Sequence, residues 1–167
     1  MKKNLLKTVI AIALLFVSVS CSAQRLFKDV PSSDNIQKVY INSAMMKLAG
    51  AAASTNAFGD DPIIKEAVKS VDNLEIISCS SSGEIKKIKP ICDKAVESSG
   101  MELATEVEDG KQTVKIYTAP DADNDNITNA LVMLVSEPNE YVAICIRGKI
   151  DIAKLTQAIA AGDSNKD

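Results

Sequence analysis

The second half of the chain contains short β-strand patterns joined by tight turns, and this restricts the possible fold more than any other feature. Apolar and polar residues alternate from Met101 to Glu108, which predicts a half-buried strand. The dipeptide Asp109-Gly110 follows and favours a tight hairpin into a returning strand at 114–117. Strands joined by hairpins pair antiparallel, so this part of the chain predicts an antiparallel sheet.

Two later strand patterns are apolar on both faces. Residues 131–135 form an almost continuous apolar run, residues 137–139 (Glu-Pro-Asn) predict a turn, and residues 141–146 predict the partner strand. A strand with apolar side chains on both faces needs cover on both sides. We therefore expect this pair in the centre of the sheet, where it is either covered on both sides or packed at an interface.

The first half of the chain mixes strands with helices. Strands are predicted at 36–41 and 74–79 from their β-favouring residues. Helical spacing of apolar residues predicts four helices, at 45–52, 61–71, 84–99 and 151–160. The order β-α-α-β-α-β-β-β-β-α predicts the α+β class, as a two-layer sandwich with helices packed on a largely antiparallel sheet.

The helix at 84–99 has the clearest start and stop signals. Ser81 and Glu84 have the spacing of a capping box, and Gly100 stands where a helix is expected to stop. Pro90 lies inside the pattern, which predicts either a kink or a start later than Glu84.

The first twenty residues have the layout of a secretory signal peptide. Lys2, Lys3 and Lys7 make a basic region, and the apolar run 8–17 is too short to span a bilayer. Small residues then precede Cys21, which predicts a bacterial lipoprotein cleaved before Cys21 and acylated on it.

Two other outcomes of export stay open. Ser18 stands where lipoprotein signals prefer leucine, and Cys21-Ser22-Ala23 could be an ordinary cleavage site that releases a soluble periplasmic protein starting at Gln24. An uncleaved membrane anchor is the third outcome. After the signal peptide we expect a polar tether at 21–35, one α+β domain at 36–160 and a disordered tail at 161–167.

The amino-acid composition of the chain excludes several classes of function. There are 19 basic and 22 acidic residues, a net charge of −3, and no basic cluster that would bind nucleic acid. The chain has no histidine, so it lacks the usual general base, the Ser-His-Asp arrangement and the commonest zinc ligand. We assign no catalytic residues and no cofactor, and we expect a protein that is not an enzyme.

One cluster has the residue types of a metal site. Asp121, Asp123 and Asp125 alternate as in the opening of a calcium-binding EF-hand loop. The continuation departs from that pattern, because Asn126 replaces the turn glycine and Val132 replaces the closing glutamate. A solvated acidic loop between two strands is the competing interpretation.

Cys79, Cys92 and Cys145 are the cysteines beyond Cys21, and three thiols allow at most one internal disulfide. Cys79 ends a strand just before a predicted helix N-terminus, a place that can make a thiol reactive. Because Cys79 has no second cysteine close by in the sequence, we expect that all three cysteines serve as small buried apolar residues.

Three segments together resemble a known family. Residues 39–46 (VYINSAMM) run from a strand into a helix, residues 74–79 (LEIISC) form a strand ending in Ser-Cys, and residues 141–150 (YVAICIRGKI) form a strand followed by a helix. This pattern resembles small exported proteins of Gram-negative bacteria catalogued as a domain of unknown function (family 4252), over residues 30–160. The resemblance implies an exported, often lipid-anchored α+β domain with a link to envelope-stress signalling.

The sequence thus predicts a lipid-anchored, non-enzymatic envelope protein that binds a protein or another envelope component. The alternative is a periplasmic module that binds a small ligand or calcium.

Overall fold

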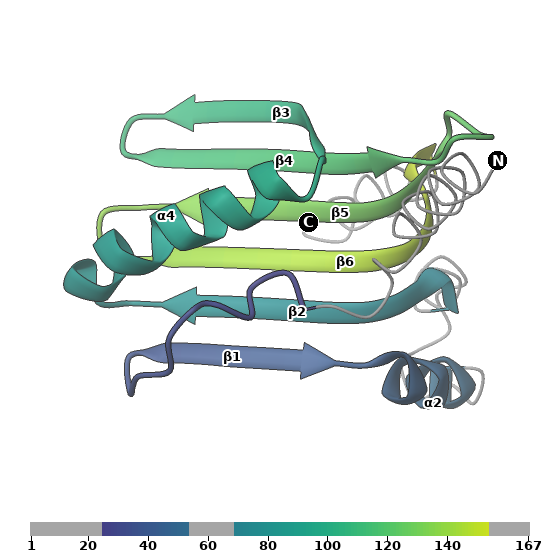
Figure 1. The fold of residues 1–167 in the computed structure, drawn as a ribbon, viewed down its shortest axis with the longest axis horizontal. Coiled ribbons are helices and arrows are strands. Elements are labelled where there is room, and N and C mark those ends of the chain that lie inside the picture. The colour runs from purple at the N-terminus through teal and green to yellow at the C-terminus, as the bar shows by residue number, and fades with distance from the viewer. Residues whose placement is uncertain (1–24, 54–68, 154–167) are drawn as a thin grey trace, which may run out of the picture.

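The structure is a computed structural model that describes residues 25–53 and 69–153 (Figure 1). Within these ranges the chain forms six strands and two helices. In chain order they are β1 (Ile36–Ile41), α2 (Ser43–Ala53), β2 (Val71–Cys79), α4 (Ser82–Ser98), β3 (Glu102–Asp109), β4 (Gln112–Pro120), β5 (Ile127–Ser136) and β6 (Tyr141–Asp151). No helix among the described residues is long and apolar enough to cross a membrane.

The six strands form one sheet in the order β1-β2-β6-β5-β4-β3, and every neighbouring pair is antiparallel. Strands β3 to β6 follow one another as a meander, and β2 pairs with β6 on the other side. The predicted hairpin at Asp109-Gly110 is confirmed, because Asp109 pairs with Gln112 and Gly110 has a φ of 60°. The pair β5 and β6 lies in the centre of the sheet, as its two-sided apolar pattern predicts.

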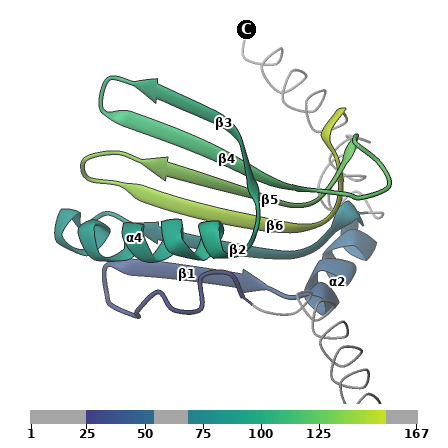
Figure 2. The ribbon, with the colours of Figure 1, turned by 45° about the horizontal axis from the view of Figure 1, so that its top comes forward.

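One face of the sheet carries the hydrophobic core. Helix α4 crosses this face diagonally, and the segment 25–35 runs beside it on the same side (Figures 1 and 2). We call this the covered face. The buried cluster joins the two covering segments to residues of β1, β2, β5 and β6. Its members are Phe27, Val30, Ile36, Ile77, Cys79, Ile85, Ile88, Cys92, Val96, Val132, Leu134, Tyr141, Ala143 and Cys145.

Helix α4 confirms the predicted helix at 84–99, with a start two residues earlier. Ser81 is the N-cap, but its side chain makes no capping hydrogen bond, so the predicted capping box does not form. The Glu84 carboxylate instead accepts a hydrogen bond from Lys87 at 3.1 Å. The helix continues through Pro90, and Gly100, with a φ of 73°, follows its end.

The predicted fold class is wrong in its balance of helix and strand. The described residues form mostly a six-stranded antiparallel sheet, and only α4 lies across a face of it, while α2 lies at one end beside β1 (Figure 1). Strand β2 takes the last residue of the predicted helix at 61–71, because Val71 begins β2. Asp151 ends β6, and Ile152 and Ala153 after it are helical, in agreement with the predicted helix start at 151.

The predicted tether at 21–35 is too long. Phe27 and Val30 are 1% and 2% exposed and belong to the core, so the folded domain includes residues well before Ile36. The signal peptide, Cys21, most of the predicted helix at 61–71, the end of the predicted last helix and the predicted tail at 161–167 lie outside the described residues.

Glycine is required where β6 meets the start of β2. Gly148 has a φ of +149°, and a Cβ placed there would lie 2.1 Å from the carbonyl oxygen of Ser70. Only a residue without a side chain allows this backbone approach. The pairing of Val71 with Gly148 and the register shift beside it therefore depend on this glycine.

Candidate functional site

A buried carboxylate fixes the start of the described chain to the sheet. Glu75 lies in the middle of β2, is 2% exposed and faces the covered side. Its Oε2 accepts a hydrogen bond from the backbone N–H of Leu26 at 2.8 Å, and its Oε1 accepts one from Phe27 at 3.2 Å. The Arg25 guanidinium lies 3.6 Å from Oε1. These contacts satisfy a buried charge with donors from a segment 48 residues away in sequence.

Two further contacts hold the same segment in place. The Arg25 guanidinium lies over the Tyr40 ring of β1, 4.8 Å from its centroid, which is a cation–π distance. The ammonium group of Lys38, also on β1, donates a hydrogen bond to the carbonyl of Val30. Segment 25–30 is therefore fixed to both β1 and β2 and leaves a space between itself and α4.

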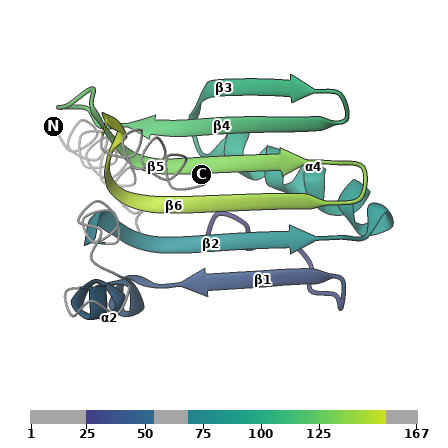
Figure 3. The ribbon, with the colours of Figure 1, turned by 180° about the vertical axis from the view of Figure 1, so that it is seen from behind.

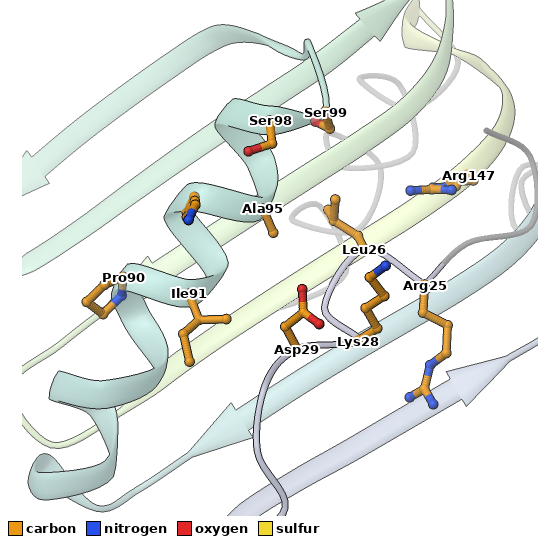
Figure 4. A pocket seen from close by; sticks show the side chains of 11 residues that line it. Arg25, Leu26, Lys28, Asp29, Pro90, Ile91, Ala95, Ser98, Ser99 and Arg147 are labelled. Atoms are coloured by element: carbon orange, nitrogen blue, oxygen red, sulfur yellow. The ribbon is translucent and has the colours of Figure 1, made fainter. Parts of the chain in front are cut away.

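This space is a groove of about 590 Å³, which we call the segment–helix groove (Figure 4). Its walls come from segment 25–29, from the second half of α4 with the residue that follows it, and from β6. In Figure 4, Ile91 and Ala95 face the segment from the helix. The lining residues are Arg25, Leu26, Lys28, Asp29, Pro90, Ile91, Lys94, Ala95, Ser98, Ser99 and Arg147.

The groove combines an apolar floor with basic residues around it. Leu26, Ile91 and Ala95 are half-buried and form the apolar part, while Lys28 and Lys94 are exposed on opposite walls. Arg25, whose charge is paired with the buried Glu75, and Arg147 also line the groove, and Asp29 is the single acidic residue of the lining. A positively charged groove on a chain with a net charge of −3 attracts anionic groups locally.

The three described cysteines are all free and buried, as predicted. Burial raises the pKa of the Cys92 thiol to about 12 and also raises the pKa of Cys145. The Sγ of Cys79 donates to the carbonyl of Ser81 at 3.7 Å and is 2% exposed, so its place before α4 does not present it to solvent. These thiols pack in the core.

Tyr141 lies beside Cys92 in the same core. Its side chain is fully buried, and its hydroxyl oxygen makes no hydrogen bond of ordinary geometry among the described residues. Burial is the main cause that raises the pKa of the Tyr141 phenol, and the neighbouring Cys92 and Asp93 raise it further. Cys92 and Tyr141 thus both remain protonated in the folded domain at neutral pH.

The predicted metal candidates do not come together. Asp121 Oδ1 accepts a hydrogen bond from the backbone N–H of Asp123, and Asn124 Oδ1 accepts one from that of Asn126, both at 3.0 Å. Such bonds stabilise the turns of this loop, and the first of them is the main cause that lowers the pKa of Asp121. Across residues 25–53 and 69–153, no three histidine, cysteine or acidic side chains, including those of Asp121, Asp123 and Asp125, form a group that could hold a metal.

No local pattern in the sequence identifies the residues of the groove. The one available signal is Glu75, a lone charge inside the apolar run Leu74 to Cys79, because a buried charge requires partners. The partner segment begins with Arg25 and looks like a polar linker, so the sequence does not identify it.

We predict that Glu75→Gln loosens segment 25–30. An amide keeps one acceptor but places an NH2 group opposite backbone N–H donors, so unfolding free energy should fall by about 2–3 kcal/mol. Trypsin should also cleave faster after Lys28. Urea unfolding and timed proteolysis measure the two effects.

The matched control for this variant is Glu84→Gln, which removes an exposed charge pair with Lys87 on α4. Its unfolding free energy should change by less than about 0.5 kcal/mol. Equal effects of the two substitutions, or unchanged cleavage after Lys28 in Glu75→Gln, would contradict the anchoring role.

We predict that stability falls as pH rises above about 9. The unfolded chain loses the Cys92 proton near the ordinary thiol pKa of 9.0, whereas the folded domain holds it to about 12. The protonated form is thus favoured by folding, and its contribution is intact below pH 9 and lost above it. Between pH 9 and 11, the slope of unfolding free energy against pH should be shallower in Cys92→Ala by up to about 1.4 kcal/mol per unit.

Denaturant unfolding at a series of pH values gives both slopes. Between pH 6 and 8 the wild-type protein and Cys92→Ala should show parallel curves, since Cys92 is protonated in both states there. Parallel curves above pH 9 as well would show that Cys92 ionises equally in the folded and unfolded chains.

Comparison with known proteins gives one match. The model of a family described as domain of unknown function (DUF4252) matches residues 27–158. No curated protein and no solved structure shows significant similarity to the chain. The matched range begins at Phe27, the first core residue of the anchored segment, and it confirms the resemblance inferred from the three strand motifs. The chain belongs to the DUF4252 family.

Proposed function

We propose that this protein is an exported, lipid-anchored and non-enzymatic component of the bacterial cell envelope that binds an acidic segment of another envelope protein in the segment–helix groove. The observation that supports this most directly is the charge of the groove. Four basic residues and one acidic residue surround its apolar floor, on a chain that is acidic in total. Charge of opposite sign steers a partner and sets specificity.

The shape of the groove favours a polypeptide segment over a membrane surface. Segment 25–29 and α4 form two walls with apolar Leu26, Ile91 and Ala95 between them (Figure 4). A bilayer is too broad to enter a groove between two such walls, whereas an extended peptide can place side chains there. An acidic peptide with apolar neighbours would match both the basic residues and the floor.

The proposed anchor would bring the groove close to the membrane. Arg25 follows Cys21 by four residues, so their Cα atoms lie at most about 14 Å apart. Acylation of Cys21 would therefore hold the groove next to the bilayer, where the juxtamembrane segments of other envelope proteins are found. A role in envelope-stress signalling fits a protein that recognises such segments.

We predict that charge reversal in the groove abolishes partner capture. Lys28→Glu combined with Lys94→Glu changes both walls from basic to acidic, and both residues are exposed, so folding should be unaffected. Wild-type protein solubilised from membranes should retain specific envelope proteins whose binding weakens with added salt. The double variant should retain less than about one tenth of them, as measured by quantitative mass spectrometry.

The control for this experiment is Lys86→Glu, which carries the same kind of charge change on α4 outside the groove lining. It should capture partners as the wild type does. Equal capture by the double variant would overturn the assignment of the groove. Co-sedimentation with phosphatidylglycerol vesicles that depends on Lys28 and Lys94 would assign the groove to lipid instead.

A small ligand is the second candidate for the same groove. A volume of about 590 Å³ lies in the usual range of small-molecule sites, and its lining is partly apolar. An anionic metabolite would use the same basic residues. Native mass spectrometry that finds a bound small molecule in the wild type, absent from the double variant, would support this candidate.

We predict that Cys21→Ala releases the protein from the membrane fraction. Without the cysteine no acyl chains can be attached, so radiolabelled palmitate should not incorporate. The wild-type protein should incorporate the label and fractionate with membranes. Absence of label from the wild type, with identical fractionation of both proteins, would favour the soluble periplasmic form.

A further inference from the structure

The face of the sheet opposite the covered face is almost wholly aliphatic, and we call it the far face. Side chains alternate between faces along a strand, so each residue between two core residues points to the far face. Strand pairing places these residues in three rows that cross five strands. In the order β1, β2, β6, β5, β4, the rows are Ile41, Leu74, Ile146, Leu131, Thr118; Val39, Ile76, Ile144, Met133, Ile116; and Gln37, Ser78, Val142, Val135, Val114.

These three rows contain no charged residue on the five strands. Where β3 continues them at the edge of the sheet, it adds Glu102, Thr105 and Val107. Glu102 is thus the one charged residue that β3 adds to the rows, and it stands at a corner. Of the three polar members, Thr118 and Gln37 lie at the ends of their rows, and Ser78 lies next to Gln37.

The apolar side chains of the far face are incompletely covered. Figure 3 shows this face, and no described helix crosses it. Its central members Ile76, Ile144 and Met133 are half-buried, in contrast with the fully buried residues between them on the covered face. At the edges, Val39 is 44% exposed and Val107 is 51% exposed. A contiguous aliphatic surface of this kind marks an interaction site.

The size of the far face suits a protein interface. Six strands about 4.8 Å apart and three rows about 6.8 Å apart cover roughly 600 Å². The five strands that carry the aliphatic rows account for roughly 500 Å² of this area, which is at the upper part of the about 300–600 Å² found for the largest apolar patch of a typical monomer. Two such faces in contact would bury about 1,200 Å² in total, which is above the roughly 1,000 Å² that a specific interface needs.

We propose that the far face is a homodimer interface, on which a second copy of this chain packs its own far face. A two-fold interface brings the same patch of both copies together, so the patch must be complementary to itself. An uncharged aliphatic surface meets this condition, because no like charges oppose one another. Sheet faces of this size pack about 10 Å apart in β-sandwiches.

Once the proposed signal peptide is removed, the two remaining segments outside the described residues contain fewer large apolar residues than the far face. Residues 154–167 contain two large apolar residues, Leu155 and Ile159. Residues 54–68 contain four, at positions 58, 63, 64 and 68. Neither segment has enough large apolar residues to cover three rows across five strands. A membrane is also a poor match, because the rows lack the aromatic and basic residues that hold proteins at a bilayer interface.

The test uses the full chain, extracted from membranes in detergent and examined by sedimentation equilibrium at matched density. Wild-type protein should have the mass of a dimer. Met133→Lys places a charge at the centre of each far face, next to its own two-fold mate, and should raise the dimer dissociation constant on the order of 100-fold. Leu103→Lys, at an exposed position of β3 that pairs with Tyr117 on the covered face, should remain dimeric.

A second measurement does not depend on the charged variant folding. A photoreactive benzoylphenylalanine at Val39, which is already exposed, should cross-link in intact cells to a product of twice the chain mass. A monomeric wild-type protein would overturn the proposal, as would a cross-link within one chain to residues 54–68 or 154–167. A cross-link to a different protein would overturn it too, and would assign the far face to that partner.

Discussion

The Glu75 carboxylate determines how the chain begins to fold onto its sheet. Taking a charge out of water is costly, and the cost is offset here by two backbone N–H donors and a guanidinium from Arg25 to Phe27. These donors come from the segment that also places Phe27 and Val30 in the core. Once they bind Glu75, Phe27 and Val30 enter the core, and the segment becomes one wall of the groove. The groove therefore exists because of a charge buried in the sheet.

Strand alternation divides the sheet into two faces with different roles. On the covered face, α4 and segment 25–35 bury Ile77, Cys145 and Val132 almost completely. The neighbouring residues along the same strands, such as Ile76, Ile146 and Leu131, point the other way and stay half-buried. Each central strand is thus apolar on both faces although only one face is covered by the described residues.

The parts of the fold that depend on local sequence could be predicted. Alternation from Met101 to Glu108, the Asp109-Gly110 turn and the apolar spacing of α4 are all local signals, and each predicted element is present. The half-burial predicted for the first strand is wrong, because β3 at the edge of the sheet is exposed along its whole length. The two-sided apolar pattern of β5 and β6 also placed that pair in the centre of the sheet. It left two explanations open, cover on both sides or an interface, and the described residues cover only one side.

The candidate site could not be predicted because its contacts are distant in sequence. Glu75 and Leu26 are 49 residues apart, and nothing near either residue identifies the other. The segment around Phe27 carries too few apolar residues for a periodic pattern, so it looked like a tether. Helix content was overestimated for a related reason. Val71 fits a helical pattern locally, but pairing between β2 and β6 holds it in a strand.

The positions of the groove and the far face, taken together, have a consequence for binding. The groove lies on the covered face and a dimer would form through the opposite face, so both grooves of a dimer would remain open. A two-fold axis between two packed sheets lies parallel to the sheets, and it can stand along the membrane normal. Both copies could then insert an acyl chain into the same bilayer and hold two basic grooves near its surface. Two linked sites raise the effective concentration of a second binding event, so even a shallow groove could retain a partner that carries two acidic segments.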